Sequence, residues 1–147
     1  MESGKGKLIP FPHFTINIII KAIHEVIILK TVNEIIERAK TLKPKKIAVA
    51  VAQDSEVLSA VEKARMAGIA GAILVGSRGK IEEIAEKSSI SLTEFEIIDI
   101  EDVKEACAKA VSLITEGRAH ILMKGIIDTS IFLKAVLNPE SYRLSKL

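Results

Sequence analysis

The strongest constraint on the fold is a repeating pattern between residues 31 and 138, in which short apolar runs alternate with segments of helical periodicity. The first run (IAVAV, 47–51) has no polar position, which is typical of a strand buried on both faces of a parallel sheet. Further strand-like runs follow at 72–75, 96–99 and 119–123. Alternating strands and helices with short connections predict an α/β fold, a parallel sheet flanked by helices.

Capping and breaking residues set the expected helix boundaries. Thr31 and Glu34 form a capping box, and Pro44 ends the helix that follows. Glycines follow the expected helices and strands, where the backbone turns. The further helices are expected from Asp54 or Ser55 to Gly68, at 81–87, at 102–116, and from Asp128 or Thr129 to Asn138.

Charge and rare residues narrow the function classes. The 147 residues carry 21 Lys and Arg against 19 Asp and Glu, a net charge of +2, and only 3% aromatics. No basic stripe with interleaved aromatics is present, so a nucleic-acid partner is not predicted. The single Cys107 excludes an intramolecular disulfide and a multi-cysteine metal site, and its helical context predicts a small buried residue. The three histidines have no metal-binding spacing, so no metal site is predicted.

The first 30 residues stand apart from the repeating pattern. A basic start and the apolar run 8–29 are similar to the beginning of a signal peptide, but Lys21, His24 and Glu25 interrupt the run. The run lacks a small-x-small cleavage site and is too broken to span a bilayer. We therefore expect residues 1–30 to be an extension outside the fold, with no membrane partner and a cytoplasmic location.

Polar residues follow three of the predicted strands. In an open parallel sheet, ligands bind beyond the carboxyl ends of the strands. Segments 52–55, 76–80 and 124–130 occupy such ends, and each leads into a predicted helix. A helix N-terminus favours anions such as phosphate, because its N–H groups are free and its dipole is positive there.

The segment 124–130 has the most residues that could bind a ligand or take part in a reaction. Lys124 brings a positive charge, Gly125 allows close approach of a ligand, and Asp128 is either a helix cap or a functional carboxylate. Thr129 and Ser130 bring hydroxyl groups to the helix start. The alternative is structural: Asp128 or Thr129 only caps the helix, and Lys124 is only solvated.

The other two segments give weaker signals. Asp54 is typical of an N-cap and Gln53 of a plain loop, although both can bind a ligand. Gly76 and Ser77 begin a segment (GSRGK) that is similar to a phosphate-binding loop. Its spacing does not match G-x-x-x-x-G-K-[ST], and no G-x-G-x-x-G follows a strand. Neither a P-loop nor a dinucleotide-binding fingerprint is therefore predicted.

Four motifs in order resemble one known family. They are IAVAVAQD (47–54), GIAGAILVG (68–76), FEIID (95–99) and MKGIIDT (123–129). Together they resemble the N-terminal half of the phosphate acetyl/butyryltransferase family, and within it the phosphate butyryltransferases most. The resemblance covers residues 31–138.

The resemblance implies an activity, a fold and a site. Such enzymes exchange an acyl group between coenzyme A and phosphate, with coenzyme A as a substrate and no cofactor; in full-length form they are homo-oligomers. The implied fold is the isocitrate/isopropylmalate-dehydrogenase-like architecture, here its first domain only. The implied catalytic residues are Lys124, Asp128 and Thr129. The implied phosphate- or CoA-binding residues are Gln53, Asp54, Gly76, Ser77, Gly125 and Ser130.

The resemblance also sets an expectation for the chain beyond residue 138. Family members continue past Asn138 into a second domain, whereas residues 139–147 depart from the family pattern. We therefore expect one domain at 31–138, a divergent tail at 139–147 and no second domain. This leaves a second possible function, a non-catalytic remnant or a module that binds CoA or phosphate. A receiver-like signalling domain is not favoured, because the strand end at Gly76 carries no acidic residue.

Overall fold

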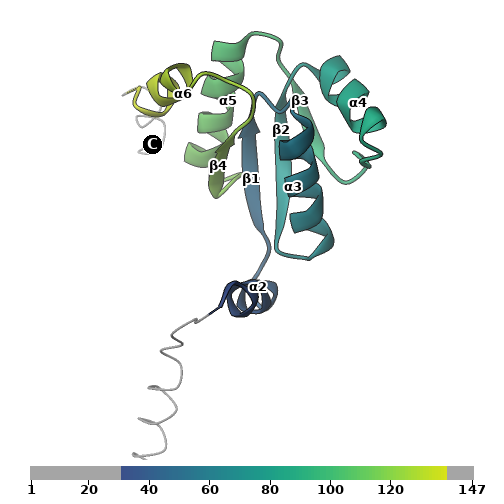
Figure 1. The fold of residues 1–147 in the computed structure, drawn as a ribbon. Coiled ribbons are helices and arrows are strands. Elements are labelled where there is room, and N and C mark those ends of the chain that lie inside the picture. Colours follow the sequence, from purple (N-terminus) through teal and green to yellow (C-terminus); the bar gives the residue numbers. More distant parts are fainter. Residues whose placement is uncertain (1–30, 139–147) are drawn as a thin grey trace, which may run out of the picture. The chain divides into compact units, whose positions relative to one another are not determined.

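The computed structural model describes residues 31–138, which contain four strands and five helices (Figure 1). The predicted extension (1–30) and tail (139–147) lie outside the described residues. The strands are β1 (Lys45–Ala50), β2 (Ala70–Gly76), β3 (Glu96–Asp99) and β4 (Ile121–Lys124). The helices are α2 (Val32–Lys40), α3 (Ser55–Met66), α4 (Arg78–Lys87), α5 (Val103–Thr115) and α6 (Thr129–Val136).

The strands form one parallel sheet in the order β3-β2-β1-β4. The central strand β1 is fully buried at Ala48, Val49 and Ala50, as expected for a strand covered on both faces. The α/β class with a parallel sheet is therefore confirmed. The isocitrate-dehydrogenase-like architecture stays a prediction.

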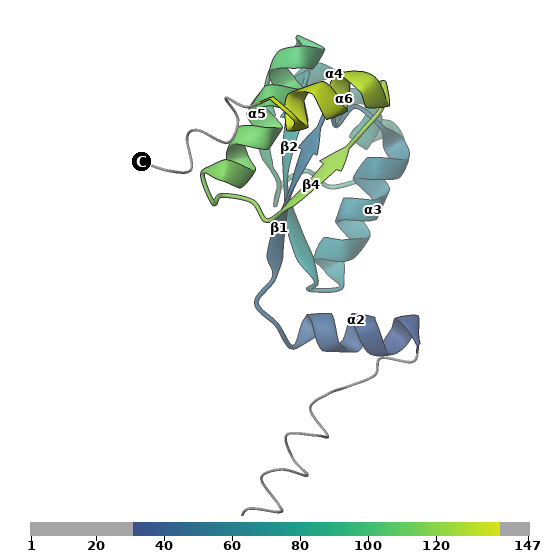
Figure 2. The same ribbon diagram turned by 90° about the vertical axis from the view of Figure 1, so that its left-hand side faces the viewer.

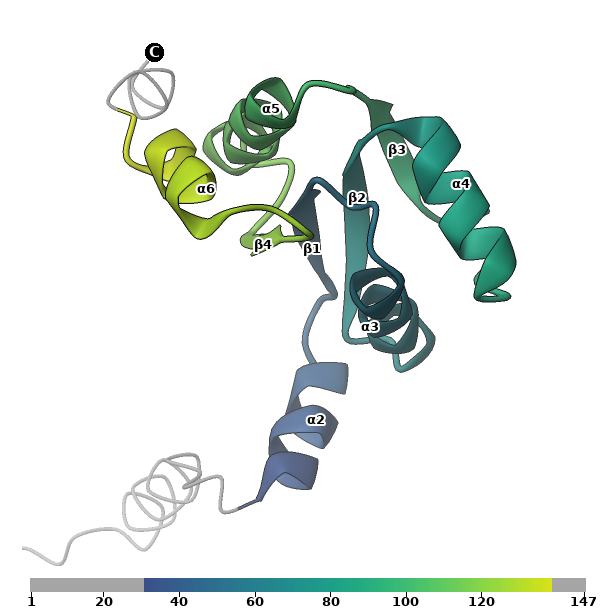
Figure 3. The ribbon, with the colours of Figure 1, turned by 45° about the horizontal axis from the view of Figure 1, so that its top comes forward.

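Two helical layers cover the two faces of the sheet. Figure 3 shows α3 and α4 on one face and α5 and α6 on the other. Under α3 and α4, the core joins Leu58 and Ile81 to Leu74 of β2. Under α5, Cys107 and Leu113 join a second aliphatic cluster. As the sequence predicts, Cys107 is buried in a helix, and this burial raises the pKa of its thiol.

The order of the strands creates the crevice in which the site lies. From β1 the chain adds β2 and then β3 in one direction, and α3 and α4 cover one face. Helix α5 then covers the opposite face and leads to β4, which pairs with β1 at the other edge (Figure 2). The segments after β1 and β4 therefore leave the sheet toward opposite faces. In open α/β sheets, ligands bind at such a switch point.

Several boundaries of helices and strands differ from the sequence prediction by one to three residues. Helix α4 begins at Arg78, three residues before the predicted start at Ile81. The Asp99 carboxylate at the end of β3 accepts a hydrogen bond from the Arg78 N–H at 2.9 Å and stabilises this earlier start. Strand β4 begins two residues later than predicted, at Ile121, although Ala119 is buried.

One further property concerns membranes. Within residues 31–138, we find no helix with the length and apolar character needed to cross a bilayer.

The first prediction tests the core beneath α3. Leu58 is fully buried, so Leu58→Ala removes apolar contacts and leaves a cavity; we expect a loss of about 2–5 kcal/mol in the free energy of unfolding. Urea denaturation followed by circular dichroism measures this loss. Leu137→Ala is the matched control, because Leu137 is 69% exposed and its truncation should change the free energy of unfolding by less than about 0.5 kcal/mol. Equal losses for the two variants would contradict the assignment of this core.

Candidate functional site

The segments after β1 and β4 meet backbone to backbone at the switch point. The Gly125 N–H donates a hydrogen bond to the Ala50 carbonyl at 2.8 Å. A Cβ atom on Gly125 would lie 1.9 Å from the Val51 carbonyl oxygen, a distance that no side chain can adopt. Gly125 therefore has a structural task, the close approach of two strand ends. Its predicted contact with a ligand stays a prediction.

Val51, the first residue after β1, has a strained backbone. Its φ is +57°, in the left-handed region that β-branched residues avoid. Such a residue costs on the order of 1–3 kcal/mol and persists only where its surroundings fix it. Here Val51 is buried, and the Ala52 N–H that follows donates to the Val75 carbonyl of β2 at 3.0 Å. The strain turns the chain sharply toward α3 and places Gln53 at the crevice.

Gln53 has a buried polar atom without a partner. Its Oε1 is shielded from solvent and accepts no hydrogen bond within the described part of the chain. A Cβ atom on Gly76 would lie 2.2 Å from this oxygen, so the side chain fits only because residue 76 is glycine. Sequence analysis predicts both residues at the site, and the structure brings them together. Buried polar atoms in proteins nearly always have partners, so this amide marks the crevice as a place to look for a ligand.

The two carboxylates of the predicted site cap helices. Asp54 accepts hydrogen bonds from the N–H groups of Glu56 (2.8 Å) and Val57 (3.1 Å) at the start of α3. Asp128 accepts one from the Ser130 N–H (2.7 Å) at the start of α6. The structural alternative is thus confirmed for both, whereas substrate binding by Asp54 and catalysis by Asp128 stay predictions.

Asp128 is held in its charged form. Hydrogen bonds from the Ser130 side chain and backbone lower the pKa of the Asp128 carboxyl, and the nearby Lys124 charge lowers it further. The carboxylate is therefore ionised at neutral pH. It can orient donors and balance the charge of Lys124, but it cannot deliver a proton.

Lys124 folds back over the β4–α6 segment. Its Nζ donates to the Ile127 carbonyl at 3.2 Å, beside the start of α6. An ammonium group has three donors, so two remain for a ligand. Thr129 and Ser130 are exposed at the same helix start. The structure therefore brings together Lys124, Asp128 and Ser130, with Thr129 next to them in sequence.

Ser77 has a different setting from the one its sequence position indicates. It stands at the N-cap position of α4 and is only 6% exposed, yet its hydroxyl does not cap the helix. The Asp99 carboxylate accepts the hydrogen bond of the Arg78 N–H instead. It lies close enough because Asp99 of β3 pairs with Gly76 of β2. Sequence reasoning missed Asp99, and the only signal was its position at the end of a strand.

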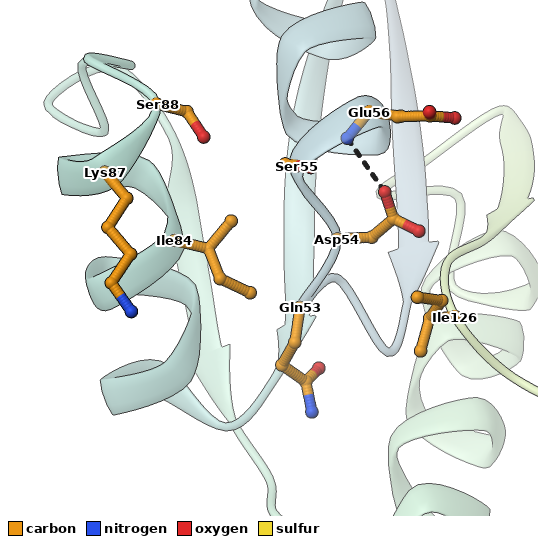
Figure 4. A pocket seen from close by; sticks show the side chains of 8 residues that line it. All are labelled: Gln53, Asp54, Ser55, Glu56, Ile84, Lys87, Ser88 and Ile126. Atoms are coloured by element: carbon orange, nitrogen blue, oxygen red, sulfur yellow. Dashed lines mark hydrogen bonds between the residues drawn. The ribbon is translucent and has the colours of Figure 1, made fainter.

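A cavity of about 650 Å³ opens beside this crevice (Figure 4). Gln53 and Asp54 line it from the β1 side, Ile84 and Lys87 from α4, and Ile126 from the β4–α6 segment. Sequence patterns do not single out Ile84 or Ile126 as site residues. Lys124, Ser77 and Thr129 do not line this cavity. The predicted residues therefore form two neighbouring groups, one around Gln53 and one around Lys124.

The described range also bears on metal binding. Within residues 31–138, no three His, Cys, Asp or Glu side chains cluster in a way that could hold a metal ion.

Comparisons with known proteins give one consistent picture. A family model described as "Phosphate acetyl/butaryl transferase" matches residues 30–124. The chain is 49% identical over 111 residues to the phosphate butyryltransferase of Clostridium beijerinckii, which covers 76% of this chain and 37% of that protein. It is 31% identical over 108 residues to the phosphate acetyltransferase of Rickettsia felis, covering 74% of this chain and 31% of that protein. The chain thus spans about a third of the length of these relatives.

A solved structure supports the fold. The crystal structure of a branched-chain phosphotransacylase from Enterococcus faecalis V583 matches with a TM-score of 0.51 and 24% identity, covering 66% of this chain and 33% of that one. At this identity the match concerns the fold alone.

The second prediction tests the contact between the two strand ends. Gly125→Ala places a methyl group against the Val51 carbonyl, so the backbone must move; we expect a loss of at least about 2 kcal/mol in the free energy of unfolding. Chemical denaturation measures it. Gly79→Ala is the control: a Cβ atom at Gly79, within α4, meets nothing within 4 Å, and a gain of about 0.5–1 kcal/mol is expected. A neutral Gly125→Ala variant would refute the close approach.

The third prediction concerns the pH dependence of the α6 cap. The folded pKa of Asp128 is lowered, so its contribution to stability is present above the unfolded pKa of about 3.9 and is lost as the pH falls through the folded value. Asp128→Ala should therefore be less stable than the wild type at pH 7, and the difference should shrink below about pH 4. Thermal denaturation from pH 2.5 to 7 tests this. Asp128→Ser keeps a capping oxygen that does not titrate in this range and should be destabilised less at pH 7.

Proposed function

Because this chain belongs to the Phosphate acetyl/butaryl transferase family, we propose that its site binds an acyl-CoA and inorganic phosphate for transfer of the acyl group between them. The specific reaction we propose is butyryl-CoA plus phosphate giving butyryl phosphate plus CoA. The higher identity to a butyryltransferase than to an acetyltransferase supports this acyl group.

The observation that carries this proposal is the placement of Lys124 beside the start of α6 at the switch point of the sheet. A phosphate there meets an ammonium group with two free donors, the hydroxyl of Thr129 and the positive end of a helix. Ser130 adds its hydroxyl when that group exchanges its hydrogen bond to Asp128 for one to the phosphate. Asp128 cannot touch the phosphate favourably, since both are anions. Its role is to hold the helix start and to keep Lys124 in place by charge.

The chemistry follows from this arrangement. A phosphate oxygen attacks the thioester carbonyl carbon, a C–O bond forms, the C–S bond breaks, and CoA leaves as the thiolate. Holding the two substrates side by side lowers the barrier by proximity. Positive groups around the phosphate and the carbonyl oxygen stabilise the charge that develops in the transition state. We assign the Gln53 amide, on the neighbouring segment, to the binding of CoA, and Gly76 leaves room for its side chain. Ser77 and the helix start capped by Asp54 complete the CoA-binding part of the site.

The proposal extends to partners and location. The reaction changes no oxidation state, so a redox cofactor is not required, and CoA enters as a substrate. We infer a cytoplasmic protein whose partners are acyl-CoA and phosphate rather than nucleic acid or membrane, and which is a homo-oligomer in its full-length form.

A second function is binding without turnover. It is favoured by one observation: Asp54 and Asp128, the two carboxylates of the predicted site, are both engaged in capping helices. Release of free thiol from butyryl-CoA separates the two functions. The purified chain is incubated with butyryl-CoA, with and without phosphate, and the thiol is followed with a disulfide reagent. Cys107 is the only protein thiol and is buried, so its own reaction with the reagent should be slow. Phosphate-dependent release supports the transferase, and its absence with retained CoA binding supports the binding module.

The fourth prediction tests Lys124. Loss of a charge-assisted donor is worth about 1.5–3 kcal/mol, so Lys124→Ala should weaken binding of inorganic phosphate at least about tenfold. Isothermal titration calorimetry of the purified chain with phosphate measures the dissociation constant.

Lys63→Ala is the control for this prediction, because Lys63 is an exposed lysine of α3 outside the site. Its phosphate affinity should equal that of the wild type. Lys124→Arg should retain most of the affinity, since it keeps the charge. Unchanged affinity in Lys124→Ala would remove this residue from the phosphate site.

A further inference from the structure

Two cavities adjoin at the crevice and share three lining residues. The cavity of about 650 Å³ in Figure 4 and a second one of about 560 Å³ are both lined by Gln53, Ile84 and Ile126. The second cavity adds Val51 and Val103 to its apolar lining. Volumes of this size are typical of small-molecule sites, which combine apolar walls with a few polar groups. The shared part is thus an apolar slot with one amide.

The exposure of Ile126 is not explained by the core. This residue is 70% exposed, although the residues on either side of it, Gly125 and Ile127, are buried and half-buried. It cannot turn away from the crevice freely, because Gly125 fixes the backbone against Val51. The fold therefore holds a large apolar side chain at the edge of a cavity, where burial by a ligand would be favourable.

Ile84 supplies the opposite wall. It is half-buried on α4 and packs against the core cluster beneath α3 and α4. Figure 4 shows the Gln53 side chain in the space between those of Ile84 and Ile126. The Gln53 amide, whose Oε1 has no partner in the described residues, therefore lies between two apolar walls. The charged residues near this slot, Lys80, Glu83 and Lys87, include a Lys87–Glu83 ion pair of 2.5 Å.

We propose that Ile84 and Ile126 hold the acyl chain of the acyl-CoA and thereby set the preferred chain length, with the Gln53 amide facing the polar part of the substrate. This inference rests on the proposed function and names the part of the site that distinguishes its substrates. A straight chain of a few carbons fits a slot that has two apolar walls and one amide between them. A protein or a membrane surface fits it poorly, because the apolar lining is small and charged residues surround it.

The test is binding of three ligands to the purified chain by isothermal titration calorimetry: free CoA, acetyl-CoA and butyryl-CoA. Each methylene buried in an apolar slot is worth about 0.8 kcal/mol, or about fourfold in affinity. The two additional methylenes of butyryl-CoA should therefore make it bind about fifteenfold more tightly than acetyl-CoA. Ile126→Ala and Ile84→Ala should each reduce this preference to about threefold or less. Ile126→Phe fills the slot and should also abolish it.

Met66→Ala is the matched control, because Met66 is a large apolar residue with a similar exposed fraction, 73%, at the far end of α3. It should retain the full preference for butyryl-CoA. Ile126 is exposed, so its variants test the slot without disturbing the core, and Ile84→Val serves where Ile84→Ala does not fold.

The outcomes separate this inference from the proposed function. Equal affinity for acetyl-CoA and butyryl-CoA, with free CoA also bound, overturns the acyl slot and leaves the proposed function standing. An unchanged preference in both Ile126 variants overturns the slot as well. Absence of binding for all three ligands overturns the proposed function, and the slot with it.

Discussion

The site depends on one contact, the approach of Gly125 to the backbone of residues 50 and 51. A hydrogen bond from Gly125 to Ala50 continues the pairing of β4 with β1 beyond the last paired residues, and the Val51 carbonyl occupies the space of a missing side chain. The strain at Val51 is part of the same arrangement, because the chain must turn sharply there. Strained residues persist where the surroundings fix them, and they concentrate at functional sites. Here that strain lies at the switch point, where a parallel sheet binds its ligands.

The aspartates at the carboxyl ends of the strands stabilise helix starts, which leaves the chemistry to other groups. Asp54, Asp102 and Asp128 each cap the helix that follows, and Asp99 stabilises the start of α4 from a neighbouring strand. A capped helix start has its position fixed but offers fewer free N–H groups to an anion. The free donors of the crevice are therefore side chains, above all the ammonium group of Lys124. An anion site built in this way depends on a lysine more than on the helix dipole.

Much of the fold follows from the sequence, because a strand with no polar position, such as 47–51, fits only the interior of a parallel sheet. The meeting of Gln53 with Gly76 and the cap by Asp99 arise from pairing between strands, which local patterns do not specify. For the same reason, local patterns do not identify the residues that line the cavity. Ile84 has the sequence context of an ordinary residue of an amphipathic helix, and Ile126 that of a short apolar run. The sequence predicts that Gly125 permits a close approach, but the structure shows the chain's own backbone as its neighbour. Sequence patterns identify which residues are unusual, and tertiary structure decides what they are near.

The segment that follows β4 links the two parts of the site. Lys124 and Ile126 lie on either side of Gly125, so the contact that fixes Gly125 also fixes the backbone from which both side chains extend. In an acyl transfer to phosphate, the distance that matters is the one between the phosphate oxygen and the carbonyl carbon, and small displacements are costly to the rate. If Lys124 holds the phosphate and Ile126 the acyl chain, this distance is set by three consecutive residues on a backbone that cannot move without breaking the sheet. A glycine without any contact to substrate would then control the alignment of both substrates.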